Sequence, residues 1–281
     1  MKKNLYLVRS ETAGIVHQSK NLLLLFLIVV VYDETFSTLF ELSELSGLGV
    51  GLLELFILML NNKLNVIAIP VIFIFIMSAF PRCRVDHFGM IRLSKKRWLT
   101  GEIFSVLTIS FLVVFILFIG TCIFLPRGLE IRGTWGSFME RFALEHGELY
   151  LQNEKLILGA EVMTQGTPVE VFLYSAAMMW LYLIMMGLLM IIGTIVGKRM
   201  LLFGIAIILT LAGGGALYVD GAFSWFFPLY HVIYGNHFNL FFAGAKFNIG
   251  YSIVFFVLVI AGLSIISAVL IKKMNVGDRR D

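Results

Sequence analysis

Six apolar runs of membrane-spanning length constrain this chain more than any other feature of its sequence. Crossing about 30 Å of hydrocarbon takes about 20 helical residues, because a helix rises about 1.5 Å per residue. Only 14% of the 281 residues are charged, against about 25% in soluble domains. We therefore expect an all-α polytopic membrane protein, one transmembrane domain over 1–281, with spans at 21–40, 64–80, 103–125, 171–196, 200–218 and 251–271.

The shorter and irregular pieces have their own expected roles. The apolar part of the first run, 22–32, would reach only about 16 Å, so its helix must continue past Asp33 and Glu34. Pro70 predicts a bend in the second span, and Gly213–Gly215 predict an irregular end to the fifth. The pieces 49–60 and 222–233 are too short to cross, so we expect interfacial or re-entrant helices there, with an outer re-entrant segment at 219–248.

The basic residues predict the orientation, because Lys and Arg are retained on the cytoplasmic side. With six spans, both termini lie on one side, together with 16 of the 22 basic residues and 5 of the 18 acidic ones. The net charge of +4 thus divides into +11 on that side and −7 on the other. We expect cytoplasmic termini and a multi-pass protein of the plasma membrane. This bias also explains the pI near 9.0 without nucleic acid as a partner. Residues 1–20 predict either a helix along the inner membrane surface or a plain cytoplasmic lead-in.

The cytoplasmic loop 81–101 mixes basic residues with apolar and aromatic ones. A loop that only anchors the chain needs the charges alone, and that remains one interpretation. The alternation of Phe88, Met90, Ile91, Leu93 and Trp98 with the charges favours a second one, a short amphipathic helix that docks onto another protein.

Four stretches of the chain are similar to those of a known family: Arg92-Leu-Ser94-Lys-Lys-Arg97-Trp98-Leu-Thr-Gly101, Trp135-Gly136, Pro228-Leu-Tyr-His231 and Ile271-Lys272-Lys273. In these stretches the chain resembles the permease subunits of type-2 ATP-binding-cassette (ABC) exporters, which share the ABCG-like membrane fold. The resemblance implies that 81–101 is the coupling loop that meets a separate cytoplasmic ATPase, with Arg92, Ser94, Lys95, Lys96, Arg97 and Trp98 as the coupling residues. It also implies that ATP and magnesium are bound by that partner. The chain itself would hold no cofactor, and a second copy or a related permease would complete the transporter.

Other motifs favour no catalytic or metal site. The stretch Gly193–Arg199 is one residue too short for a phosphate loop, and Gly193 and Gly197 fit a helix-packing face better. Cys83 and Cys122 lie at different depths and cannot pair or form a metal site. The sequence thus predicts a transporter subunit that exports a peptide, antibiotic or lipid-like molecule. The alternatives are a stand-alone intramembrane enzyme and a membrane immunity or scaffold protein without transport.

The remaining candidate functional residues are charged or titratable ones in or near the predicted spans. Asp33 and Glu34 are two-thirds along the first span, so they either line a translocation path or lie at the outer interface. For His231 and His237 we expect structural or interfacial roles. The large outer loop, 126–170, is either a solvated loop on the membrane or a small helical lid. The other candidates for an enzyme are Glu54, His146 and Asp220.

Overall fold

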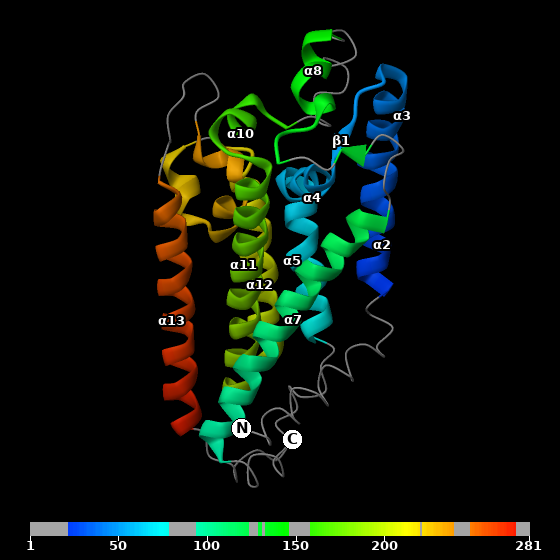
Figure 1. Cartoon of the computed structure of the whole chain (residues 1–281). Helices are drawn as coiled ribbons and strands as arrows, with labels where there is room; N and C mark the ends of the chain where they lie inside the picture. The colour runs from blue at the N-terminus through cyan, green and yellow to red at the C-terminus, as the bar shows by residue number, and fades with distance from the viewer. Residues whose placement is uncertain are drawn as a thin grey trace.

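A computed structural model describes residues 22–78, 94–123, 129–130, 133–145, 158–219, 221–238 and 248–273. Over these residues the chain is all-α, apart from two strands of two residues each, and the long helices run side by side in one bundle (Figure 1). At one end of the bundle α7 (Lys95–Ile123) begins and α13 (Ile249–Lys273) ends. We call this the basic end. The opposite end carries α8 (Ser137–Glu145) and the strands, and we call it the cap end.

The helix α11 (Pro168–Val196) is the centre of the bundle. Its start is fixed by Thr167, whose hydroxyl accepts the N–H of Glu170 while the Glu170 carboxylate accepts the N–H of Thr167. It ends at Gly197, which has a left-handed φ of 75°. In its most apolar stretch 78% of the residues are buried within the chain, against 11% for α13.

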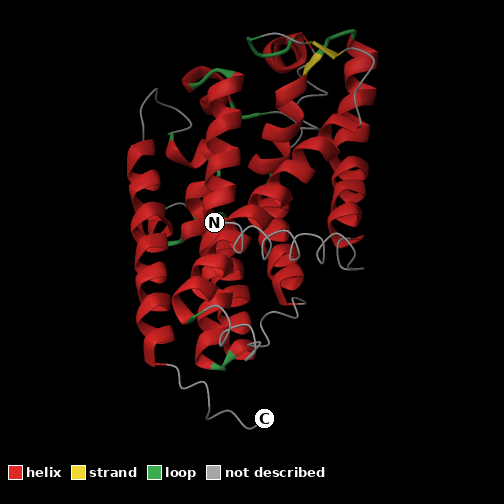
Figure 2. Ribbon diagram, turned by 60° about the horizontal axis from the view of Figure 1, so that its bottom comes forward, coloured by secondary structure: helices red, strands yellow, loops and turns green. Residues whose placement is uncertain are grey.

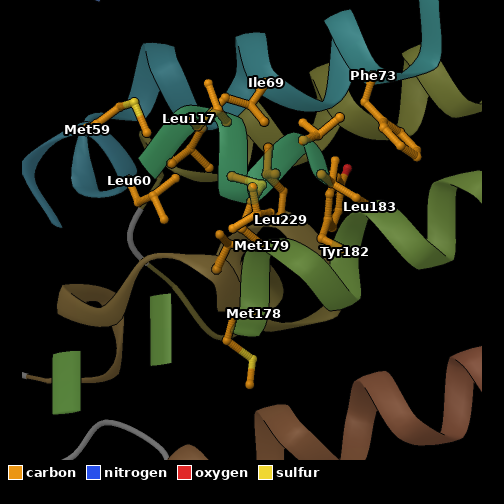
Figure 3. Packing of buried hydrophobic residues seen from close by; sticks show 14 of the residues in the cluster. Met59, Leu60, Ile69, Phe73, Leu117, Met178, Met179, Tyr182, Leu183 and Leu229 are labelled. Carbon is orange, nitrogen blue, oxygen red and sulfur yellow. The ribbon is translucent and has the colours of Figure 1, made fainter. Parts of the chain in front are cut away.

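Large apolar side chains fill the space around α11 (Figure 3). Met179, Tyr182 and Leu183 of α11 lie among side chains from α4 (Leu52–Asn61), α5 (Lys63–Ser78), α7 and the segment before α13, whereas Met178 points away from them. The labelled partners are Met59, Leu60, Ile69, Phe73, Leu117 and Leu229. In a membrane, where lipid is as apolar as these residues, close packing and not water exclusion would hold such helices together.

Glycines on α11 allow that close packing. A Cβ added to Gly187 would collide with Val106 of α7, and one added to Gly193 would lie 2.8 Å from the Cβ of Leu202. Leu202 belongs to α12 (Arg199–Ala216), which follows α11 after a tight turn. The stretch Gly193–Lys198 is therefore a helix end, with the N–H of Lys198 bonded to the Gly193 carbonyl, and Gly193 serves helix packing as expected.

The first span is longer than predicted. It runs from Leu22 to Ser46 as α2 (Leu22–Val31), the π-helical turn η2 (Tyr32–Phe36) and α3 (Ser37–Ser46). The helix does continue past Asp33 and Glu34, and it stops only at Gly47, whose φ is 69°. Its second half carries the charged residues Glu41 and Glu44 on the exposed side, which is why hydropathy alone underestimated its length.

The second apolar region is sharply bent. The helices α4 and α5 meet at Asn62 with a bend of 80°, and α5 continues as one helix through Pro70. Five helices of the described chain are long and apolar enough to cross a membrane, or six if α4 and α5 count as one broken span. The fifth predicted span is α12, which stays helical through Gly213–Gly215 to Ala216 and does not end irregularly there.

Short elements lie at the cap end. The strand β1 (Val50–Gly51) pairs in parallel with β2 (Leu129–Glu130), and both lie beside α8 (Figure 2). A further short helix, α10 (Ala160–Gln165), precedes α11. Three 3-10 helices, η5 (Ala222–Phe226), η6 (Pro228–Val232) and η7 (Tyr234–His237), form the segment between α12 and α13. None of the three is long enough to cross, in line with the expectation for 222–233.

Candidate functional site

At the basic end, cationic side chains cap the ends of neighbouring helices. The Lys95 ammonium lies 3.5 Å from the carbonyl oxygen of Lys272, in the last turn of α13. The Arg199 guanidinium donates to the carbonyl of Ser78, the last residue of α5. The last carbonyls of a helix lack partners and carry partial negative charge, so these cations stabilise both ends. The start of α7 is thereby joined to α13, and the start of α12 to α5.

The predicted coupling residues separate into exposed and buried ones. Ser94 is exposed, and its carbonyl accepts the N–H of Trp98 at 3.0 Å where α7 begins. Lys96 and Arg97 are exposed to solvent, whereas Trp98 is 7% exposed and belongs to the packed core. Arg92 lies outside the described residues. A partner protein that approaches the basic end would therefore meet Lys96 and Arg97, while Trp98 anchors α7 within this chain.

Asp33 and Glu34 are both exposed on the π-helical turn η2. The Asp33 carbonyl accepts the Ser37 hydroxyl at 2.7 Å, and the exposed side of the helix continues with Glu41 and Glu44. Among the described residues, no hydrogen bond or ion pair joins the Asp33 or Glu34 side chain to another candidate residue, so their role in a translocation path stays a prediction.

Glu54 is a buried carboxylate whose role the sequence did not indicate. Its side chain is fully buried in the first turn of α4. One oxygen accepts the N–H of Gly51 at 2.7 Å, and the other accepts the N–H of Gly136 from the segment that leads into α8. A carboxylate at a helix N-terminus also has a favourable position in the helix dipole. Glu54 thus ties the outer segment to the bundle.

A second carboxylate completes this connection. Glu130 accepts the hydroxyl of Ser137 at 2.7 Å and its N–H at 3.1 Å. The Ser137 hydroxyl oxygen in turn accepts the N–H of Gly49 at 2.8 Å, and the Gly49 carbonyl accepts the N–H of Phe138 at 2.9 Å. We call Gly49–Gly51, Glu54, Glu130 and Gly136–Phe138 the cap clamp. It holds the described part of the outer loop at the α3–α4 connection.

Trp135 extends the clamp toward α11. Its indole N–H lies 3.1 Å from the carbonyls of both Met163 and Gly166, which flank the end of α10. The resemblance had singled out Trp135-Gly136, and these two residues lie at the centre of the connection. The described parts of the outer loop therefore pack as a folded unit on the bundle. Whether this unit works as a lid stays a prediction, and His146 lies outside the described residues.

The two histidines form a buried polar group with Tyr174 of α11 and Ser252 of α13, which we call the histidine cluster. Both rings and Ser252 have no exposed surface. The Ser252 hydroxyl lies 2.9 Å from His231 Nδ1 and 2.8 Å from His237 Nε2, so it bridges the two rings. Tyr174 Oη lies 2.8 Å from His237 Nε2 and donates to the His231 carbonyl at 3.0 Å.

Burial controls the charge of these histidines. Desolvation lowers the pKa of His231, although its bond to the Trp225 carbonyl acts in the opposite direction. Desolvation lowers the pKa of His237 to about 4, with a smaller contribution from His231. Both rings are therefore neutral at pH 7. The sequence predicted structural roles for them, and their contacts agree with that. It did not predict Ser252 or Tyr174, which carry no motif. Asp220 lies outside the described residues.

The described residues contain no group of three or more His, Cys, Asp or Glu side chains arranged to hold a metal ion. Comparison with known proteins adds no relative: no protein-family model matches the chain, and neither a curated protein nor a solved structure matches it.

Proposed function

We propose that this chain is the membrane-spanning permease subunit of an ABC exporter in the plasma membrane. In this proposal a separate cytoplasmic ATPase binds the ATP and magnesium, and the chain works as a dimer or with a related permease. The cargo is a peptide, antibiotic or lipid-like molecule, and both termini are cytoplasmic. The support is the resemblance around Arg92–Gly101 together with the charge distribution over the bundle.

The observation that carries the proposal is the exposed pair Lys96 and Arg97 at the start of α7. The cap of α13 by Lys95 holds this start against the last turn of another span. A push on the start of α7 would therefore reach α13, and through the packing of α7 against α11 it would reach the centre of the bundle. A coupling element needs this combination of exposed charge and rigid attachment.

The test is co-expression of the chain with the ATPase encoded nearest to its gene. We expect a complex that survives purification in detergent, ATP hydrolysis by the complex, and no hydrolysis by the chain alone. Robust hydrolysis by the isolated chain would overturn the proposal, as would failure of every neighbouring ATPase to bind a chain that is monodisperse.

A second candidate, a stand-alone intramembrane enzyme, is favoured by one observation. Ser252 Oγ lies 2.9 Å from His231 Nδ1, and His231 Nε2 is oriented by the Trp225 carbonyl at 2.8 Å, an arrangement that serine hydrolases use to activate a nucleophile. The complete burial of Ser252 opposes it. Labelling of the chain by a fluorophosphonate probe, lost in Ser252→Ala, would favour the enzyme, and absence of labelling in the folded chain would exclude a reactive Ser252.

A further inference from the structure

The connection between α12 and α13 exposes large aromatic side chains at the cap end. Phe223 and Phe226 of η5 are 72% and 74% exposed, and Tyr218, two residues beyond α12, is also exposed. The ring centroids of Phe223 and Phe226 lie 6.2 Å apart, so the two rings adjoin. We call Tyr218, Phe223 and Phe226 the aromatic patch. Removal of such rings from water is favourable, and an exposed apolar patch marks a surface that another molecule covers.

Hydrogen bonds hold the segment that carries the aromatic patch. The Ser224 hydroxyl donates to the carbonyl of Val219 at 2.6 Å, which fixes η5 to the residues that follow α12. The Trp225 carbonyl lies 2.8 Å from Nε2 of the buried His231, which fixes η5 to the histidine cluster. The exposed rings therefore project from a segment that is attached to the bundle on both sides.

Charge distinguishes this part of the cap end from the rest of it. Residues 221–238 contain no Lys, Arg, Asp or Glu, whereas α8 exposes Glu140 and Glu145 and α3 exposes Glu44. In Figure 1, α3 and α8 extend beyond the level at which α13 begins, and the segment from η5 to η7 lies close to that level. The charged elements suit water, and the uncharged aromatic segment suits the membrane boundary, where aromatic residues are enriched.

The lengths of α12 and α13 support this placement. Tyr251 near the start of α13 and Lys272 near its end are 21 residues apart, or about 31 Å along a helix. Arg199 and Tyr218, at the two ends of α12, are 19 residues apart, or about 28 Å. No charged residue lies between either pair in the sequence. Both lengths match the hydrocarbon thickness of about 30 Å, so cations at one boundary place Tyr218 and Tyr251 at the other.

A cation lies on the aromatic patch. The Lys63 ammonium is 4.8 Å from the centre of the Tyr218 ring, and Lys63, the first residue of α5, is exposed. An ammonium group is costly within hydrocarbon, but at the level of the lipid phosphates it meets a complementary charge. The pair therefore combines an aromatic ring that suits the membrane boundary with a charge that suits a phosphate.

We propose that the aromatic patch and Lys63 form a phospholipid-binding surface in the leaflet on the cap side. The rings of Phe223 and Phe226 lie among the upper parts of the acyl chains, and the Lys63 ammonium binds the phosphate. The exposed side of α12, with Ile208 and Leu211, continues from this surface toward the basic end and contacts the acyl chains. The lipid thus holds the connection between α12 and α13 at the membrane boundary. This inference goes beyond the proposed function and depends on neither transport nor an ATPase.

The depth of the aromatic patch can be measured by electron paramagnetic resonance. Nitroxide labels are attached to Phe223→Cys or Phe226→Cys in the full-length chain, in which Cys83 and Cys122 are replaced by serine. The chain is reconstituted into nanodiscs of phosphatidylcholine and phosphatidylglycerol. We expect oxygen, which concentrates in lipid, to reach both labels, and a water-soluble nickel chelate to be kept away from them.

Two exposed leucines provide matched controls. The label on Leu45→Cys, at the end of α3, should be reached by the nickel chelate, and the label on Leu258→Cys, in α13, by oxygen alone. Labels at 223 and 226 that are as open to the chelate as the one at 45 would overturn the proposal. Shielding of both labels from both reagents would overturn it too, because a protein surface, such as a second copy of the chain, would then cover the patch.

The contact of Lys63 with phosphate has its own test, solid-state NMR of the chain with nitrogen-15 lysine. The nanodiscs are kept in phosphate-free buffer, so that lipid is the only source of phosphorus. The side-chain signal of Lys63 is identified by its absence from Lys63→Arg, and phosphorus pulses should reduce its intensity. An unreduced signal would overturn the proposed phosphate contact. An equal reduction by inorganic phosphate, in a detergent without phosphorus, would show an anion site in place of a lipid surface.

Discussion

The Glu54 carboxylate of α4 accepts the backbone N–H of Gly136, a residue 82 positions later in the chain. Gly136 suits this place because a Cβ there would lie 2.7 Å from the backbone nitrogen of Gly51 and 3.0 Å from a Glu54 oxygen. The connection of the outer loop to the bundle therefore depends on the two acceptor oxygens of a buried Glu54 side chain and on the absence of a side chain at residue 136.

The cap clamp can be tested at this glycine. Gly136→Ala should push the outer segment off Glu54, because the added methyl meets backbone that cannot move aside. We expect faster proteolysis of 129–145 and a loss of about 1–3 kcal/mol in the free energy of unfolding. Gly133→Ala is the control, since a Cβ there has no neighbour within 4 Å. Equal protease resistance of the two variants would contradict the clamp.

Glu54 itself should be sensitive to the loss of its acceptor oxygens. Glu54→Ala leaves the N–H groups of Gly51 and Gly136 without their partner, so it should lower the free energy of unfolding by about 1–3 kcal/mol for each buried group. The exposed Glu44 is the comparison, because Glu44→Ala removes a carboxylate that water already solvates. Chemical denaturation in mild detergent measures both. A small effect of both substitutions would show that the clamp adds little stability.

Helix packing around α11 gives a third prediction. Gly187→Ala places a methyl against Val106 of α7, and we expect destabilisation of about 1–3 kcal/mol. Gly204→Ala on α12 meets no atom within 4 Å and should be neutral or slightly stabilising, because alanine favours the helix. The thermal midpoint in detergent, measured for both variants, checks the difference.

The predicted coupling residues differ in their exposure, so substitutions of them should have different effects. Trp98→Ala should destabilise the chain by about 3–5 kcal/mol, because it opens a cavity in the packed core. The double change Lys96→Glu with Arg97→Glu should leave stability unchanged and weaken ATPase binding, because both side chains are exposed. Pull-down of the ATPase, normalised to folded permease, measures this. Normal binding by the double variant would remove these two residues from the interface.

Stability should also depend on pH through His237. Its pKa in the folded chain, about 4, is below the unperturbed value of about 6.5, so the unfolded chain binds the proton more tightly. The stability that this neutral ring contributes is complete above pH 6.5 and is lost as the pH falls toward 4, by about 3 kcal/mol at most. Thermal melts at pH 7, 5.5 and 4 should show this loss in the wild type and a smaller one in His237→Gln.

Topology can be tested with single cysteines in a chain that lacks Cys83 and Cys122. Glu145→Cys, exposed in α8, should react with an impermeant maleimide in intact cells. Lys273→Cys, exposed at the end of α13, should react only after the membrane is opened. The reverse pattern would invert the orientation that the charge distribution predicts.

The spans could be predicted because hydropathy is a local property of the sequence. Long apolar runs such as 171–196 gave their helices to within three residues, and the two short pieces were recognised as too short to cross. The first span was underestimated because Ser37–Ser46 buries only one side, with Leu39 and Leu42 covered and Glu41 and Glu44 exposed. The start of α7 at Lys95 was also missed, since charged residues at a helix end look like a loop by hydropathy.

Residues of the candidate sites could be predicted from the sequence only where the residue type alone marked the position as unusual. Glu54 and the histidines stood out as polar residues near apolar runs, but their partners did not. Gly136 is 82 positions from Glu54, and Ser252 is 21 from His231. Such pairs depend on how the helices pack, and an ordinary glycine or serine carries no signal of it. Trp135-Gly136 was found through the resemblance and not through its chemistry.

The burial of α11 limits how this protein can move. Glycine contacts fix α11 to α7 and α12, and its side chains fill the core that α4 and α5 share. Under the proposed function, α11 would stay stationary together with α7 and α12, and the peripheral helices α2 and α13 would tilt around it. Spin labels on α13 should change their distance to labels on α2 between nucleotide states, while distances measured to α11 change least.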